Sequence, residues 1–409
     1  MATQTPEAAY RIDVAQAVRL IDEFMPTYGS QLVPLEDAAG CILRQTVIAE
    51  RDQPPYDRVT MDGIAIDSAA LDQGLREFTL AGNQAAGQPV LRLPATNSCI
   101  EIMTGAVLPI GADTIIPVER IEHNADRVIL EPGYEAIPGQ FIHARGSDHA
   151  KNRPLLDPGV RIRAPEMAIL TAAGSATVAV AEWPKIAIIS TGDELVDVGL
   201  PLKAHQIRSS NDHAIQAALR ARGFHHCVRA HLPDEPELLL QRTGELHEAT
   251  DVLILSGGVS MGKYDYVPEV LEKLGVQLVF HKVLQRPGLP MWFGVSQSGK
   301  PVFALPGNPV STLVCVIRYV LPALLQAMGM RPEAVEYVVL GDAVEFEPDL
   351  SWFLPVKLAG DADNPGRALP RPTNTSGDFI SLGDSDGFAE LQRGQDHYEA
   401  GLRVPFYRW

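Results

Sequence analysis

Three short segments of the sequence combine glycines with hydroxyl, amide or acidic side chains. They are residues 190–194 (STGDE), 256–266 (SGGVSMGKYDY) and 306–311 (PGNPVS). Glycines and a serine directly after a strand expose backbone N–H groups with little side-chain bulk, which suits a phosphate or another oxyanion. Each segment taken alone could also be an ordinary tight turn. The candidate binding residues are Thr191, Gly192, Ser256, Gly257, Gly258, Ser260, Pro306, Gly307, Asn308 and Ser311.

Carboxylates near these segments could hold a divalent cation. Glu194 and Asp265 belong to two of the segments, and Asp234 follows another expected strand. Mg²⁺ prefers a few carboxylates together with substrate phosphates and water, so these three residues are candidate magnesium ligands. In a chain with Asp+Glu 51, the simpler reading of any one of them is a solvated surface group. Asp234 could instead cap a helix.

Two further carboxylates, Asp62 and Asp148, lie in turn-like segments of a β-rich stretch. Asp62 stands in a Met-Asp-Gly sequence, which is also common in hairpin turns. His143 and His149 flank Arg145 and could contact an anion, although the sequence shows no arrangement of a nucleophile and a base.

The three segments follow short apolar runs that alternate with helical patterns. Runs near residues 186–190, 252–255 and 302–305 are typical of strands buried on both faces. Their alternation with helices predicts a three-layer, parallel α/β domain over residues 183–330. In such a sheet, ligands bind at the carboxyl ends of the strands. Asn211 and Asn308 are expected to cap helices, with Pro309 in the first helical position of a long core helix.

The flanking segments have a different texture. Residues 7–48 and 149–182 are helical or mixed and predict one domain, with one helix after Asp13, another after Pro34 and a third over residues 165–173. Residues 49–148 contain short apolar runs between glycine, proline and asparagine turns and predict an inserted β-rich domain. Residues 331–409 alternate in the same way and predict a C-terminal β-barrel or sandwich.

Composition limits the possible classes of function. The chain has 409 residues, a hydrophobic fraction of 46% and a net charge of -17, which describe a globular protein of several domains. The negative charge argues against nucleic-acid binding, because phosphate contacts need a basic surface. The four cysteines have no zinc-site spacing and indicate reduced thiols. With neither a signal peptide nor a membrane span expected, the predicted location is the cytoplasm.

Five motifs together resemble one family. They are TMDG at residues 60–63, IMTGA at 102–106, STGDEL at 190–195, SGGVS at 256–260 with DY at 265–266, and LPGNPVS at 305–311. In this combination and order the chain resembles the molybdopterin molybdenumtransferase family, also called the MoeA family, which includes the E domain of gephyrin. The resemblance extends over essentially the whole sequence and implies that residues 7–48 and 149–182 form a helical hinge domain and that the α/β domain binds the pterin.

The resemblance implies a reaction and an assembly. The reaction is adenylylated molybdopterin plus molybdate giving molybdenum cofactor and AMP, with Mg²⁺ as cofactor. The assembly is an elongated homodimer whose site joins the α/β domain of one subunit to the N-terminal half of the other. Substrate handover from an adenylyltransferase and to molybdoenzyme chaperones is a further expectation, and Ser376 in the segment NTSGD matches a family serine near the site. The implied catalytic residues are Asp62, Thr104, Asp148, Glu194, Asp234 and Asp265.

One segment departs from the family pattern. Where relatives usually carry Lys-Pro-Gly-Lys-Pro, this chain has RPGLP at residues 286–290. Arg286 keeps the first charge, and its guanidinium can grip an oxyanion through two N–H groups, whereas Leu289 removes the second charge. This difference leaves the choice between molybdate and tungstate open. Two other functions also remain possible, namely a magnesium-dependent nucleotide pyrophosphatase with a related α/β domain and a non-catalytic scaffold like gephyrin.

Overall fold

The computed structural model describes residues 8–259, 265–360 and 366–409. Ser260 lies outside the described residues, so its predicted role remains a prediction. By compactness the chain divides into two units, each considered by itself below. Unit 1 comprises Met1–Arg44, Pro158–Arg163 and Thr177–Trp409, and unit 2 comprises Gln45–Asp157 and Ala164–Ala176. The expected boundaries of four domains remain predictions.

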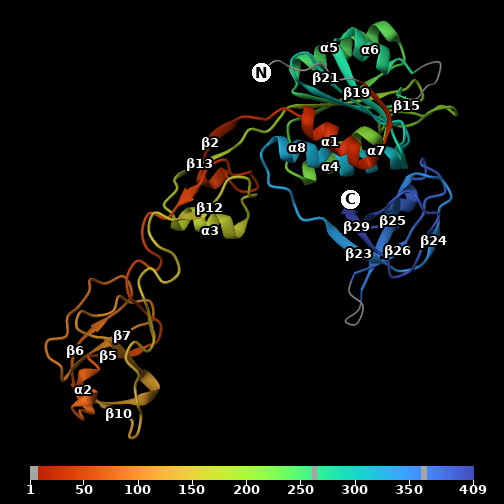
Figure 1. Cartoon of the computed structure of the whole chain (residues 1–409). Helices are drawn as coiled ribbons and strands as arrows, with labels where there is room; N and C mark the ends of the chain where they lie inside the picture. Colours follow the sequence, from red (N-terminus) through yellow and green to blue (C-terminus); the bar gives the residue numbers. More distant parts are fainter. Residues whose placement is uncertain (1–7, 260–264, 361–365) are drawn as a thin grey trace. The chain divides into compact units, whose positions relative to one another are not determined.

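The centre of unit 1 is a mixed sheet whose strands follow the order β1-β19-β21-β22-β18-β14-β17 (Figure 1). Neighbours within the series β22-β18-β14-β17 run parallel, as predicted. The prediction of an entirely parallel sheet is wrong at β21, which runs antiparallel to both β19 and β22. Only residues 284–291 connect β19 to β21, and a parallel crossover needs a dozen residues or more. The strands are β1 (Ala9–Ile12), β14 (Ile186–Thr191), β17 (Cys227–Leu232), β18 (Val252–Ser256), β19 (Val276–Val283), β21 (Trp292–Ser296) and β22 (Pro301–Leu305).

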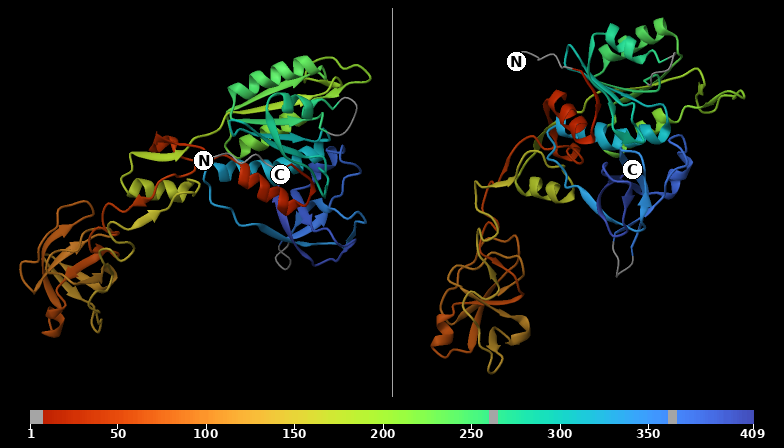
Figure 2. Two further views of the ribbon diagram at one scale, coloured as in Figure 1. Left: turned by 45° about the horizontal axis from the view of Figure 1, so that its top comes forward. Right: turned by 45° about the vertical axis from the view of Figure 1, so that its right-hand side comes forward.

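Helices cover both faces of this sheet, which confirms the three-layer arrangement (Figures 1 and 2). Along β14, Ile186 and Ile188 pack into the core beneath one helical layer, whereas Ala187 and Ile189 pack beneath the other. This alternation is the two-residue period of a strand buried on both faces. One layer contains α1 (Val14–Phe24), α4 (Asn211–Ala221), α7 (Pro309–Cys315) and α8 (Leu321–Ala327), and the other contains α5 (Pro236–Ala249) and α6 (Val267–Lys273).

The predicted long core helix runs from Pro309 to Ala327 through a π-helical turn at Val316–Val320. Of the described residues, this helix alone has the length and apolar composition of a membrane span. Its most apolar window is 78% buried inside unit 1, as expected of a core helix. Asn308 occupies the N-cap position and Pro309 follows it, but the Asn308 side chain makes no capping hydrogen bond, so that part of the prediction is wrong.

The C-terminal part of unit 1 is a closed barrel of five strands, which confirms the barrel rather than the sandwich. The sheet order β25-β26-β23-β29-β27 closes because β25 also pairs with β27. A separate short strand, β20 (Gln285–Arg286), pairs with β25 and ties the segment before residue 287 to the barrel. The barrel strands are β23 (Glu336–Leu340), β25 (Ser351–Ala359), β26 (Arg367–Pro370), β27 (Gly387–Leu391) and β29 (Arg403–Arg408).

Unit 2 is mainly β structure, as predicted for the inserted segment. Its six-stranded sheet has the order β8-β5-β7-β6-β10-β9. The helix expected over residues 165–173 is present as α3 (Ala164–Ala172). The prediction of a helix after Pro34, which belongs to unit 1, is wrong. Only a single 3-10 turn, Leu35–Asp37, follows β2 (Ser30–Pro34). The sheet strands are β5 (Gly63–Ile66), β6 (Glu77–Gln84), β7 (Ser98–Ile102), β8 (Thr114–Pro117), β9 (Ile121–Asn124) and β10 (Arg127–Leu130).

Gly63→Ala should destabilise unit 2 selectively. Gly63 has a φ of +154°, and a Cβ there would overlap the backbone carbonyl of Ile116 on the paired strand β8. We expect a loss of roughly 2–4 kcal/mol, because a backbone clash inside a buried sheet cannot be relieved by a rotamer change. Gly87→Ala is the matched control, since its φ is +79° but a Cβ would meet nothing within 4 Å. That change should cost about 1 kcal/mol.

Tryptophan fluorescence and circular dichroism in urea separate the two units in this test. Trp183, Trp292, Trp352 and Trp409 all belong to unit 1. Gly63→Ala should therefore lower the urea midpoint of the dichroism transition that reports on unit 2. The midpoint of the fluorescence transition should stay at its wild-type value. Equal midpoints for Gly63→Ala and Gly87→Ala would show that the close approach to Ile116 has no energetic consequence.

Candidate functional site

A hollow of about 760 Å³ lies at the carboxyl ends of β14, β18 and β22, and is called the strand-end pocket below. Eleven of the residues proposed from sequence line it: Thr191, Gly192, Glu194, Asp234, Ser256, Gly257, Gly258, Asp265, Pro306, Gly307 and Asn308. Residues that were not proposed as site residues from sequence also line it: Leu195, Ile207, Arg208, Ser209, Ser210, Asn211, Val259, Pro290, Pro309, Gly377 and Phe379. The parallel strand ends thus gather in one place most of the side chains and glycines that the sequence marked.

The glycines allow the three loops to approach each other closely. A Cβ at Gly257 would lie 2.7 Å from the carbonyl oxygen of Thr191, and its φ is +100°. A Cβ at Gly307 would lie 3.4 Å from the Cα of Gly257. A side chain at Gly257 would clash at this distance, so the packing of the loops requires a glycine there, whereas a Cβ at Gly307 would make only an ordinary van der Waals contact.

Asn211 joins these loops with its side-chain amide. Its Nδ2 donates hydrogen bonds to Ser256 Oγ at 2.8 Å and to the carbonyl of Gly307 at 2.7 Å. The predicted capping role of Asn211 is wrong, because α4 begins at this residue and Ser210 occupies the N-cap position. The short polar side chain that suggested a cap instead fixes the ends of β18 and β22 to the start of α4.

Two of the predicted serines have different surroundings. Ser376, from the C-terminal part of the chain, accepts a hydrogen bond from Asn308 Nδ2 at 2.8 Å, and its carbonyl accepts one from the Val310 N–H. It therefore lies beside the pocket loop at the start of α7. Ser311 is 3% exposed within α7 and is not part of the pocket lining.

Acidic side chains give the pocket a strongly negative character. Burial raises the pKa of Asp234, and the neighbouring charges of Asp193, Glu194 and Asp265 raise it further. Asp234 is not a helix cap, since Glu235 occupies that position before α5. Its own N–H is held by Asp193 Oδ1 at 3.1 Å, which fixes the loop after β17 against the loop after β14. The repulsion among these carboxylates is what a bound cation would relieve.

The acidic set fits a magnesium ion that is shared with a substrate. Among the described residues, no three His, Cys, Asp or Glu side chains are grouped closely enough to enclose a metal by themselves. Mg²⁺ commonly uses one or two carboxylates and completes its shell with phosphate oxygens and water. Glu194, Asp234 and Asp265 line one pocket and can supply those carboxylates.

Arg286 does not line the strand-end pocket. As part of β20 it pairs with Trp352 of β25, and its guanidinium lies 6.0 Å from the ring centre of Phe346. Pro290, at the end of the same loop, does line the pocket. The structure therefore directs the charge of Arg286 towards the barrel and only the end of the loop towards the pocket.

The remaining predicted residues belong to unit 2. Asp62 precedes β5, and its Oδ1 accepts hydrogen bonds from the N–H and the hydroxyl of Thr104 at 2.6 and 2.7 Å. These two donors lower the pKa of Asp62, so the carboxylate is held in its charged form. Asp62 is thus fixed by a residue 42 positions away in the chain, which the hairpin alternative did not anticipate.

Asp148 is held by His143, a contact that the sequence did not reveal. His143 Nε2 lies 2.8 Å from Asp148 Oδ1, and Arg58 Nη2 lies 3.1 Å from His143 Nδ1. Because arginine can only donate, Nδ1 must accept and Nε2–H must donate to the carboxylate. Arg145 bonds to Asp52 instead of remaining available beside the two histidines.

The chain matches family profiles along most of its length. Residues 12–174 match the MoeA N-terminal region (domain I and II), residues 187–326 a probable molybdopterin binding domain, and residues 331–409 the MoeA C-terminal region (domain IV). A molybdopterin molybdenumtransferase of a Synechocystis species is 40% identical over 399 residues, which cover 97% of this chain and 100% of that protein. The chain belongs to the MoeA family.

Further similarities agree with this membership. A molybdopterin molybdenumtransferase of Synechococcus elongatus is 33% identical, with 91% of this chain and 93% of that protein covered. A crystal structure of the MoeA protein of Pyrococcus horikoshii superposes with a TM-score of 0.80 at 30% identity, covering 97% of this chain and 99% of that one. The MoeA fold with several domains and a C-terminal barrel is therefore shared over nearly the full length.

Proposed function

We propose that this chain is a molybdopterin molybdenumtransferase, which inserts molybdate into adenylylated molybdopterin and releases AMP in the last step of molybdenum cofactor biosynthesis. Membership of the MoeA family over nearly the whole chain supports a role in this pathway. The observation that carries the proposal is the strand-end pocket, where glycine loops, hydroxyl groups and carboxylates from three strand ends converge. This combination suits a ligand that has phosphates and arrives with a divalent cation.

The residues of the pocket have separable tasks in this proposal. The backbone at Gly257 and Gly307 offers close approach to a phosphate group, and Ser256, fixed by Asn211, offers a hydroxyl. Glu194, Asp234 and Asp265 would hold Mg²⁺, which when bound supplies neutralisation of phosphate charge. No side chain is required to form a covalent intermediate, so positioning and charge stabilisation would account for most of the rate.

We also propose that the active form is a homodimer in which unit 2 of one subunit completes the strand-end pocket of the other. Asp62, Thr104 and Asp148 would then be catalytic residues contributed by the second subunit. The hydrogen-bonded states of Asp62 and Asp148 support this role, because both carboxylates are fixed in orientation before any ligand binds. Receipt of substrate from an adenylyltransferase and delivery to molybdoenzyme chaperones, all in the cytoplasm, complete the proposal.

Release of AMP from adenylylated molybdopterin, with and without molybdate, tests the function. We expect release that requires both Mg²⁺ and molybdate. Release at the same rate without molybdate would indicate a pyrophosphatase that uses water as acceptor. Tight binding without any release would indicate a scaffold. Parallel titrations with molybdate and tungstate measure the oxyanion preference.

A further inference from the structure

We infer that Arg208 binds a phosphate group of the nucleotide-containing substrate in the strand-end pocket and is its principal cationic contact. The inference rests on the proposed function and adds a residue to it. Among the described residues that line the pocket, Arg208 is the only one with a positively charged side chain. It lies in β16 (Ile207–Arg208), which the sequence analysis did not single out.

Charge balance in the pocket requires such a residue. Glu194, Asp234 and Asp265 are acidic, and a substrate with two linked phosphates brings further negative charge. One divalent cation offsets part of this charge, and the whole chain, with a net charge of -17, repels anions at long range. A guanidinium within the pocket supplies a fixed positive charge that matches the geometry of phosphate oxygens.

The guanidinium is held in place but retains donors for a ligand. Arg208 Nη1 donates one hydrogen bond, 2.6 Å long, to the carbonyl oxygen of Asp197. Within the part of the chain that the structure describes, no other hydrogen bond or ion pair of this side chain is present. Arginine has five N–H donors, so a pair of N–H groups remains available to donate hydrogen bonds to an anion. Anchoring at one nitrogen reduces the rotamer freedom lost on binding.

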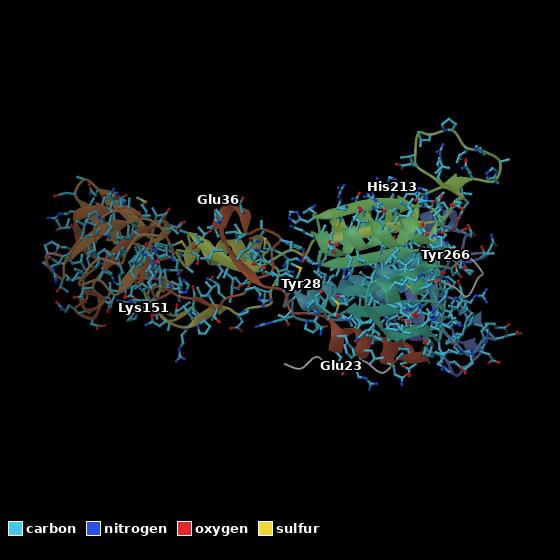
Figure 3. The ribbon with its side chains drawn as sticks, turned by 90° about the horizontal axis from the view of Figure 1, so that it is seen from above. Glu23, Tyr28, Glu36, Lys151, His213 and Tyr266 are labelled. Carbon is cyan, nitrogen blue, oxygen red and sulfur yellow. The ribbon has the colours of Figure 1, made fainter. Side chains whose placement is uncertain are left out.

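The residue after Arg208, Ser209, is also held in place by a hydrogen bond to α4. Ser209 Oγ donates to Asp212 Oδ1 at 2.8 Å, and Asp212 is paired with Arg229. Asp212 is 5% exposed, so this contact is an internal support and not a ligand site. Figure 3 shows His213, the next residue of α4, at the same side of unit 1 as the projecting loop between β15 (Leu195–Val196) and β16.

A second, independent observation points to a ligand in the same pocket. Thr191 is 5% exposed and lines the pocket, yet its Oγ1 has no hydrogen-bond partner in the described structure. A buried hydroxyl without a partner is costly, and a phosphate oxygen would satisfy it. Arg286 cannot fill the same role in this arrangement, because its guanidinium faces Phe346 of the barrel region.

Binding of AMP to the full-length protein tests the inference, with Arg208→Gln, Arg208→Lys and Lys203→Gln as variants. Lys203 lies in the loop between β15 and β16 outside the pocket lining, so Lys203→Gln removes the same charge as a matched control. Arg208→Gln should weaken AMP binding about tenfold to a hundredfold, since a charge-assisted hydrogen bond to phosphate is lost. Arg208→Lys should recover part of the affinity, because lysine restores the positive charge but not the paired N–H donors of the guanidinium.

Two further readouts separate a phosphate contact from a structural role. The dependence of AMP affinity on salt concentration should become weaker in Arg208→Gln and stay unchanged in Lys203→Gln. In turnover, the KM for adenylylated molybdopterin should rise while the KM for molybdate stays constant. Thermal transitions of all variants should coincide with that of the wild type.

Several outcomes would overturn the inference. Unchanged AMP affinity and salt dependence in Arg208→Gln would remove Arg208 from phosphate binding. Weaker salt dependence in Lys203→Gln alone would move the contact to that lysine, and an increased KM for molybdate alone would make Arg208 an oxyanion ligand. A wild-type protein that binds AMP but shows no molybdate-dependent release would refute the proposed function and leave the Arg208 contact standing.

Discussion

Glu194→Gln and Asp265→Asn should each reduce molybdate-dependent AMP release on the order of a hundredfold without destabilising the protein. Both residues line the strand-end pocket, and each change removes a negative charge that the proposal assigns to magnesium binding. The two carboxylates also raise the pKa of Asp234 by repulsion, so their removal relieves an unfavourable interaction in the free protein. We therefore expect thermal transitions equal to or higher than that of the wild type, together with a large loss of activity.

Measuring the rate of AMP release at increasing Mg²⁺ concentrations makes this test specific for magnesium binding. The variants should need higher Mg²⁺ concentrations for half-maximal rate, because an amide is a poorer magnesium ligand than a carboxylate. Glu272→Gln, which neutralises an exposed carboxylate on α6 outside the pocket, is the control and should behave like the wild type. Turnover within a few-fold of wild type in both pocket variants would exclude Glu194 and Asp265 from the mechanism.

Mixed dimers of Asp62→Ala and Asp265→Ala should regain activity that neither homodimer has. Asp62 belongs to unit 2 and Asp265 to unit 1. If each pocket is completed by the other subunit, a mixed dimer has one pocket with both carboxylates and one with neither. Random exchange makes half of the dimers mixed, so the activity should reach about a quarter of the wild-type value. Native mass spectrometry of differently tagged subunits measures the exchange directly.

A second mixture provides the control for this experiment. Asp62→Ala combined with Thr104→Ala should not recover, because both changes affect the same contact in unit 2 and every pocket lacks one partner. Recovery in this mixture would show that the rescue does not depend on which unit is altered. Absence of recovery in the first mixture despite proven exchange would mean that Asp62 and Asp265 do not meet across subunits.

The positions of the glycine loops could be predicted because their strands are continuous apolar runs. β14, β18 and β22 are parallel neighbours, so their carboxyl ends must share one edge of the sheet. Glu194 and Asp265 then follow from their places within those loops. The antiparallel strand β21 was missed because residues 292–296 carry no alternation that distinguishes a buried strand from other core segments.

Side-chain directions were harder to predict, because they depend on distant partners. Asn211 resembles a helix cap in sequence, but its amide bonds to Gly307, which is 96 residues away. Arg286 faces the barrel because β20 pairs with β25, a contact that local sequence does not encode. Arg208 has no motif around it, and only the assembled pocket shows that it is the cation among several carboxylates.

A single turnover with enzyme in excess of adenylylated molybdopterin shows whether AMP release is coupled to insertion of molybdenum into the pterin. Molybdate and Mg²⁺ are added, the reaction is quenched at intervals, and both AMP and pterin-bound molybdenum are measured. We expect the two products to appear at the same rate and in equal amounts, and neither to appear without molybdate. Release of AMP without uptake of molybdenum by the pterin would contradict this expectation.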